Sequence, residues 1–265
     1  MGKRLLYLEC SMGAAGDMLM GALLELLPDK QEFLQQMNEL GLEGVQVLAE
    51  PSKKCGILGT HVRVTVHGEE EASEDVQEHE HHHHHHHHEH VHSHYHFGMT
   101  DVAAVLEASK LPERVRQQVL AVYTRIGEAE AHVHGVPVEQ VHFHEVGALD
   151  AVADVAGCCL LLELLQPDGI WASPVHVGSG FVRCAHGVLP VPAPATAYLL
   201  KGIPMYGGEV AGELCTPTGA ALLKHFVTRF GPLPMMETEK IGYGMGSKDF
   251  ERANCVRAFW GTAKF

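Results

Sequence analysis

Basic residues are scarce in this chain of 265 residues. Lys and Arg number 19 against 33 Asp and Glu, and the formal net charge is −14 at pH 7. Surfaces that bind nucleic acids need clustered Lys and Arg to neutralise phosphates. The scarcity of basic residues therefore argues against a nucleic-acid partner, whereas the acidic balance favours solubility and the binding of cations.

Paired cysteines and long apolar runs are also lacking. The seven cysteines are odd in number and scattered, and none are spaced as C-x-x-C, which excludes a disulfide framework and a zinc-finger spacing. The longest apolar candidate, 156–165, is too short to span a membrane and is interrupted by Glu163. The N-terminal apolar run is too short for a signal peptide. We expect a cytoplasmic protein with no membrane partner.

Strand-like and helix-like segments alternate along the chain. Residues 4–10 form an apolar run that ends in a small-residue turn, and 61–68 alternate with period two, as strands do. A long helix is expected after Pro112, because apolar residues recur there at helical spacing, at Val115, Val119, Val122, Ile126, Ala129 and Val133. Further helices are expected at 17–27, 31–40, 101–109 (with Thr100 as N-cap), 148–165, 192–202 and 216–226, and further strands within 169–182 and 184–192. This order predicts an α/β fold, with α+β as the alternative.

One segment interrupts the alternation. Residues 69–98 are acidic and then histidine-rich, with almost nothing apolar. Such a segment cannot repay its ordering entropy by burial, so we expect a disordered loop. It separates an N-terminal α/β segment, 1–68, from the main portion, 99–265, where helices pack on a sheet. We expect the two portions to form one domain.

Histidine dominates this loop. Thirteen of the 22 histidines lie between His79 and His96. A purification tag is one explanation, but the tract is internal and mixed with glutamate, which favours a natural metal-gathering loop. A disordered tract does not hold a metal in one reactive geometry, because catalysis needs positioned ligands. The expected metal-gathering residues are His81, His82, His83, His84, His85, His86, His87, His88, His90, His92 and His94.

A second histidine cluster has the spacing of a more ordered metal site. The segment HVHGVPVEQVHFHEVGALDAVAD, 132–154, contains two H-x-H pairs, Glu145 and two aspartates. In an extended chain His142 and His144 share one side, and aspartates four residues apart share a helix face. Imidazoles and carboxylates suit nickel or zinc. The alternative is a set of solvated surface residues. The predicted ligands are His132, His134, His142, His144, Asp150 and Asp154.

Two small-residue turns predict an anion site. In CSMGAAGDM, 10–18, an apolar strand leads into a helix start whose free amides suit a phosphate. TPTGA, 216–220, has the same character, and GYGMGSK, 242–248, is a third amide-rich, flexible segment. The alternative for each is a tight turn with a capping side chain, and Cys10 is either reactive or buried and inert. The predicted phosphate-binding residues are Gly13, Gly16, Asp17, Thr216, Thr218 and Gly219.

These motifs together resemble one family. CSMGAAGDM, the histidine-rich insertion, EAEAHVHGVPVEQVHFHEVGALDAVAD, HGVLPVPAPAT, ELCTPTGAALL and GYGMGSKD follow in that order over nearly the whole chain, as in the nickel-insertion proteins (LarC). The first motif of that family commonly reads Asp-Cys-Phe-Ser-Gly-Ile-Ser-Gly-Asp-Met. Here Glu9 replaces the first aspartate, while Cys10, Gly16, Asp17 and Met18 match.

The resemblance implies an enzyme of the lyase class. It implies insertion of nickel into pyridinium-3,5-bisthiocarboxylic acid mononucleotide, which makes the nickel-pincer cofactor of lactate racemase and consumes CTP with Mg or Mn. Full-length members continue into a C-terminal domain associated with CTP, so this chain is expected to be the N-terminal part, with that domain as a partner. Removal of a ring proton requires a general base, and His144 and Glu145 are the predicted catalytic residues.

Two other function classes stay open. The histidine loop alone fits a nickel storage protein or metallochaperone without covalent chemistry. The spacing also fits a zinc-type hydrolase with His142, His144 and Asp150 as ligands and Glu145 as base. A homo-oligomer is compatible with the sequence, which does not define the oligomeric state.

Overall fold

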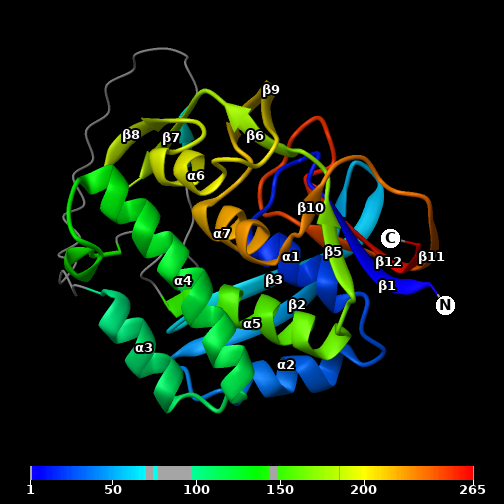
Figure 1. Cartoon of the computed structure of the whole chain (residues 1–265), viewed down its shortest axis with the longest axis horizontal. Coiled ribbons are helices and arrows are strands. Elements are labelled where there is room, and N and C mark those ends of the chain that lie inside the picture. The colour runs from blue at the N-terminus through cyan, green and yellow to red at the C-terminus, as the bar shows by residue number, and fades with distance from the viewer. Residues whose placement is uncertain (1, 70–73, 77–96, 144–148, 185, 265) are drawn as a thin grey trace.

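A sheet of seven strands lies at the centre of the protein (Figure 1). The computed structural model describes residues 2–69, 74–76, 97–143, 149–184 and 186–264. The strand order is β10 (Arg229–Phe230), β5 (Gly169–Ala172), β1 (Lys3–Glu9), β12 (Cys255–Ala263), β11 (Met236–Met245), β3 (Ile57–Val66) and β2 (Val45–Lys54). The predicted α/β class, with strands and helices mixed, is confirmed.

The sheet combines parallel and antiparallel pairs. β1 runs parallel to β5 and antiparallel to β12, so that Lys3 pairs with Ala263 and the two ends of the described chain lie side by side. β10 is parallel to β5, and β11 is antiparallel to β12. β3 is parallel to β11 and antiparallel to β2. The first and last described strands therefore occupy the middle of the sheet.

Helices cover one face of this sheet in two layers. α1 (Gly16–Leu24) packs on β11, β3 and β12, and α5 (Leu149–Leu165) packs on α1. α4 (Glu113–His134) lies over α5, where α3 (Met99–Ala108), α6 (Pro194–Leu199) and α7 (Pro217–Phe226) contact it. α2 (Lys30–Asn38) packs against β2. α5 is buried over most of its length because it packs on α1, β2 and β3 from one side and is covered by α4 from the other.

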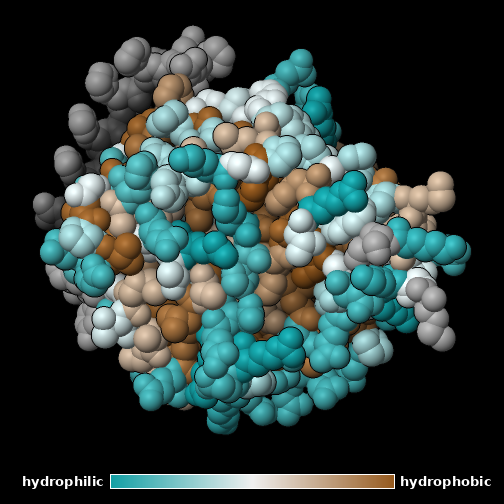
Figure 2. All heavy atoms as spheres, viewed as in Figure 1, coloured by the Kyte–Doolittle hydropathy of each residue, from teal (hydrophilic) through white to brown (hydrophobic). Residues whose placement is uncertain are grey.

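Two smaller sheets lie beside the helical layers. β4 (Glu74–Val76), β7 (Phe181–Cys184) and β8 (Gly187–Pro190) form one, and β6 (Val175–Ser179) pairs with β9 (Met205–Glu213) in the other. A 3-10 turn, η1 (Val138–Gln140), follows α4. Hydrophilic residues cover much of the face seen in Figure 2, with apolar residues visible between them near its middle.

The predicted helices are present, with differences at their ends. The stripe of α4 is buried from Val115 to Ala129, but Val133 is 39% exposed in the last turn. α3 begins at Met99 rather than after Thr100, because Gly98 is its N-cap and Asp101 accepts a hydrogen bond from the Gly98 amide. Within the segment predicted as a loop, β4 pairs with β7. Residues 77–96 of that loop lie outside the described residues.

The segment 242–248, predicted to be flexible, is largely part of a strand. Its first residues complete β11, which pairs with β12 up to Met245. Gly244 faces α1, and a Cβ atom there would lie 1.7 Å from the Met18 carbonyl oxygen. Glycine is therefore required because the α1 backbone rests directly on the strand, not because the segment needs freedom.

Candidate functional site

The turn between β1 and α1 is built around Gly13. Its φ of +81° favours glycine, and a Cβ atom there would lie 1.9 Å from the Leu214 carbonyl oxygen. The Gly13 amide donates to the Cys10 carbonyl, and the Ala14 amide donates to the Leu214 carbonyl. These hydrogen bonds tie the turn to the chain segment that leads into α7.

The two turns predicted to bind a phosphate are neighbours in space. Ala14 forms a bridge with Cys215, and the Thr216 amide donates to the Ala14 carbonyl at 3.1 Å. The Thr216 hydroxyl caps α7 by accepting from the Gly219 amide at 3.2 Å, while Thr218 is buried. The capping alternative is thus confirmed for Thr216, and both turns belong to one structural unit.

An internal carboxylate lies at the N-terminus of α1. The Asp17 amide donates to Asp154 of α5, and a Cβ atom on Gly16 would lie 2.6 Å from Asp154 Oδ2. Helix N-termini favour anions because their amides are unpaired and the helix dipole is positive there. The Asp17 amide, expected to face a phosphate, is therefore engaged by a side chain of the protein itself.

Three aspartates and a tyrosine meet at this helix end. Burial, followed by the charges of Asp17 and Asp150, raises the pKa of Asp154 well above its usual range. Burial and the charges of Asp150 and Asp154 raise the pKa of Tyr123 likewise. Asp154 Oδ1 is buried and has no hydrogen-bond partner among the described residues. We call Asp17, Asp150 and Asp154 the carboxylate cluster.

Tyr123 links this cluster to the HFH segment. The Tyr123 side chain is fully buried, and its ring meets that of Phe143 edge-on at 5.8 Å between centroids. Phe143 is buried and His142 beside it is exposed. His144 and Glu145, the predicted catalytic residues, lie outside the described residues, as do all the predicted residues of the metal-gathering loop.

The two histidines at the end of α4 point to different neighbours. His132 stacks on Tyr198 at 4.4 Å between centroids. His134 contacts Glu130 at 3.3 Å, and its ring lies 4.8 Å from that of His186. Residues two apart on a helix do not face each other, so this pair does not converge. Within the described ranges, no group of three or more His, Cys, Asp or Glu side chains is arranged to hold a metal ion.

The sequence did not single out Tyr123 or His186. Tyr123 stands in a helical apolar stripe, where an aromatic residue usually signals only core packing. His186 lies far from α4 along the chain. Cys10, by contrast, matches the inert alternative, because burial raises the pKa of its thiol to about 12. Cys158 and Cys159 are buried core residues of α5, as expected.

The comparisons identify the family. The model of the family described as "Nickel insertion protein" matches residues 6–264, and the chain belongs to that family. It is 41% identical over 251 residues to a Desulfitobacterium hafniense protein, 40% over 259 residues to one from Clostridium kluyveri, and 39% over 263 residues to one from Acetivibrio thermocellus. Each is named "Pyridinium-3,5-bisthiocarboxylic acid mononucleotide nickel insertion protein".

The alignments cover nearly all of this chain but only part of each relative. They span 95%, 97% and 98% of this chain but only 56%, 62% and 61% of the relatives in the same order. The chain thus spans about three fifths of the length of these relatives. No solved structure matches it. None of the described helices is long and apolar enough to cross a lipid bilayer.

Proposed function

We propose that this chain takes part in inserting nickel into pyridinium-3,5-bisthiocarboxylic acid mononucleotide. Membership of the nickel insertion family over residues 6–264 is the observation that carries the proposal. Nickel and the mononucleotide are both substrates in this reaction, and the thiocarboxylates in the names of the relatives are soft donors that suit nickel. The product would serve as the nickel-pincer cofactor of lactate racemase.

The incoming nickel is proposed to bind beside the carboxylate cluster. Phe143 packs on Tyr123, whose hydroxyl is close enough to Asp150 and Asp154 to respond to their charges. His144 follows Phe143 directly, and Glu145 and Asp150 are five positions apart, a span of at most about 18 Å of extended chain. The packing of Phe143 therefore supports a site made of His142, His144, Asp150 and Asp154.

His132 and His134 complete the proposed ligand set from α4. Their different neighbours support a role in passing nickel from the histidine tract toward α5 rather than in a single coordination shell. The chemical step breaks a ring C–H bond and forms a nickel–carbon bond, and its proton passes to a base. His144 or Glu145 is the proposed base.

The CTP-dependent part of the reaction is proposed to require a region outside this chain. CTP, with Mg or Mn, is proposed to act through the additional region that the longer relatives contain, which would place the activity in the lyase class only when both parts are present. All seven cysteines are free, which supports a reducing, cytoplasmic setting. The phosphate role of Gly13, Gly16, Asp17, Thr216, Thr218 and Gly219 stays a prediction.

A second candidate is nickel storage or delivery without covalent chemistry. The tract His79–His96, with thirteen histidines, favours it. Reconstitution separates the two. The chain is incubated with nickel, the thiocarboxylated mononucleotide and CTP, with and without the C-terminal region of the Acetivibrio thermocellus relative, and the nickelated product is sought by mass spectrometry. Product in the complete mixture supports insertion, whereas several bound nickel ions per chain without product in any mixture would support storage.

A further inference from the structure

A cavity of about 350 Å³ lies at the carboxyl ends of β1 and β5. Tyr7 and Glu9 line it from β1, and Arg257 and Phe259 from β12. The residues that alternate with them along these strands belong to the core under the helices: Leu6, Leu8 and Ala258. Because side chains alternate along a strand, the cavity is on the opposite face of the sheet from the carboxylate cluster.

Size and position both suit a small molecule. The volume falls within the range of about 300–1,000 Å³ that is usual for ligand sites. Ligands of sheets with parallel strands commonly bind beyond the carboxyl ends of those strands. Ser11, from the turn after β1, and Ser173 and Pro174, from the segment after β5, complete this edge of the cavity. The turn that begins here ends at Asp17 in the carboxylate cluster.

The floor of the cavity offers a ring and two opposite charges. Tyr7 pairs with Phe259, with ring centroids 6.2 Å apart, and Glu9 pairs with Arg257 through an ion pair. The Tyr7 hydroxyl is used, because it donates to the Gly231 carbonyl. The Arg257 side chain is 39% exposed, and its guanidinium lies over the Phe259 ring at 5.2 Å. The cation thus remains within reach of a ligand.

One wall of the cavity is the exposed ring of Tyr206, which packs against the buried side chain of His176. Tyr206, at the start of β9, is 44% exposed, and its ring lies 4.7 Å from that of His176. His176 is only 1% exposed, and its Nδ1 has no hydrogen-bond partner in the described part of the chain. Burial and the nearby Arg252 lower the pKa of His176, so a neutral imidazole supports Tyr206. The free face of Tyr206 is available to stack on a flat ligand.

We propose that this cavity binds the pyridinium ring of the mononucleotide, an inference that rests on the function proposed above. Tyr206 stacks on the ring, and the Glu9 carboxylate complements its positive charge. Arg257 binds an anionic group of the ligand, either the phosphate or a ring thiocarboxylate. The cavity holds the organic substrate. Nickel and the proposed base reach the bound ring past the 11–17 turn, at the carboxyl edge of β1, because the ring carbon loses its proton to the base and binds nickel.

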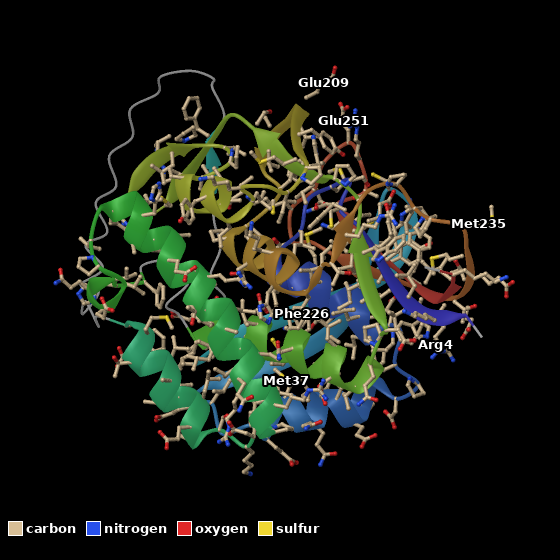
Figure 3. The ribbon with its side chains drawn as sticks, viewed as in Figure 1. Arg4, Met37, Glu209, Phe226, Met235 and Glu251 are labelled. Atoms are coloured by element: carbon tan, nitrogen blue, oxygen red, sulfur yellow. The ribbon has the colours of Figure 1, made fainter. Side chains whose placement is uncertain are left out.

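The chain offers closely matched control residues. Arg4, 47% exposed, also pairs with a glutamate, Glu239, and lies over an aromatic ring, that of Trp260 at 5.7 Å. Figure 3 shows Arg4 near the N-terminal end of β1, well away from Glu209 on β9. Tyr198 is 36% exposed, and its ring lies 4.4 Å from that of His132, a separation similar to the 4.7 Å between Tyr206 and His176. Neither control residue lines the cavity.

Calorimetric titration with nicotinic acid mononucleotide, a pyridinium carboxylate with a phosphate, tests the proposal on the nickel-free chain. Arg257→Gln and Tyr206→Ala should each weaken binding about tenfold or more, while Tyr206→Phe stays within about twofold. Arg4→Gln and Tyr198→Ala should bind as the wild type does. Circular dichroism and thermal unfolding verify that each variant is folded.

Two further probes identify the group that Arg257 binds. The nucleoside lacks the phosphate, and nicotinamide mononucleotide lacks the ring carboxylate. If Arg257→Gln no longer matters for the nucleoside, the phosphate is its partner, and if it no longer matters for nicotinamide mononucleotide, the carboxylate is. Equal binding by Arg257→Gln and Arg4→Gln, equal binding by Tyr206→Ala and Tyr198→Ala, or no wild-type binding at millimolar probe would overturn the proposal.

The outcome is separable from that of the proposed function. Cavity-dependent binding of the probe without any nickelated product in the reconstitution would reject nickel insertion and leave the cavity assignment standing. If Arg257→Gln and Tyr206→Ala both form product with the wild-type KM for the mononucleotide, the cavity assignment is rejected and nickel insertion is retained.

Discussion

The two ends of the 11–17 turn present different chemistry. At Asp17, three half-buried aspartates lie close together, and one oxygen of Asp154 is buried without a hydrogen-bond partner among the described residues. At Ser11, on the opposite face of the sheet, an ion pair and aromatic rings line an open cavity. The first environment gathers like charges, and the second combines opposite charges with aromatic rings. One short, glycine-dependent turn thus joins the carboxylate cluster to the cavity.

The charges at the two ends are also balanced differently. Glu9 and Arg257 neutralise each other at the cavity, where Arg257 is partly solvated. Burial, followed by the charges of Asp17 and Asp150, raises the pKa of Asp154, and the hydrogen bond from the Asp17 amide offsets only part of this effect. An arrangement that destabilises the folded protein is typical of functional sites. The carboxylate cluster is therefore the end expected to trade stability for activity.

The largest expected effect breaks the metal end alone. Replacing His142 and His144 together by alanine removes two proposed ligands, and the rate of nickel insertion should fall by more than about 100-fold. Binding of nicotinic acid mononucleotide should be unchanged, because the cavity lies on the other face. A variant with His61→Ala and His67→Ala loses the same number of imidazoles and should stay active. Wild-type activity in the first variant would remove the HFH segment from the site.

A change at Gly13 should damage both ends at once. Gly13→Ala adds a Cβ atom against the Leu214 carbonyl at a positive φ, and the free energy of unfolding should fall by at least about 3 kcal/mol. Gly202→Ala is the control, since Gly202 has a φ of +83° but open space around it. It should cost about 1 kcal/mol. Equal losses in chemical denaturation would show that the close contact is unimportant.

Deleting the histidine tract, 80–94, should spare both ends. The nickel concentration needed for half-maximal insertion should rise at least about tenfold, because the local supply of metal is lost. At saturating nickel, the rate of the deletion variant should match that of the wild type. A control variant, in which serine and glycine replace the tract at equal length, should also reach the wild-type rate at saturating nickel. Complete loss at saturating nickel would move the chemistry into the tract.

The smallest expected effect concerns stability. A carboxyl group with a raised pKa in the folded state binds its proton more tightly there than in the unfolded state. Its contribution to the free energy of unfolding is therefore present at low pH and is lost as pH rises above about 4. Asp154→Asn lacks this loss and should be more stable than the wild type by about 1 kcal/mol or more at pH 7, with a smaller difference at pH 4. Asp168→Asn makes the same change in a surface carboxylate that accepts a hydrogen bond from the Arg4 amide, and it is the control for the substitution itself. Denaturant midpoints measure this, and a pH-independent difference for Asp154→Asn would contradict the account.

Regular apolar spacing explains what could be predicted of the fold. β1 and the helical stripe of α4 follow directly from such spacing, whereas α5 is buried almost continuously from Ala151 to Leu161 and has no single apolar stripe. β2, β9, β11 and β12 were not predicted as strands. β9 and β11 are rich in glycine and exposed polar residues, so no alternation marks them, and their pairing is decided by distant segments.

The carboxylate cluster was partly predictable, and the cavity was not. Asp150 and Asp154 share a helix face as their spacing predicted, but two-residue spacing separates His132 from His134 once α4 forms. Glu9 and Arg257 lie 248 positions apart and meet only through the register of β1 and β12. A motif near one residue gives no indication of such a partner.

Steady-state kinetics of nickel insertion in the reconstituted mixture test the central division most directly. Tyr206→Ala should raise KM for the mononucleotide about tenfold with little change in kcat, whereas Asp154→Asn should lower kcat with little change in that KM. The same pattern of change in both variants would contradict the assignment of substrate and metal to opposite ends of the turn.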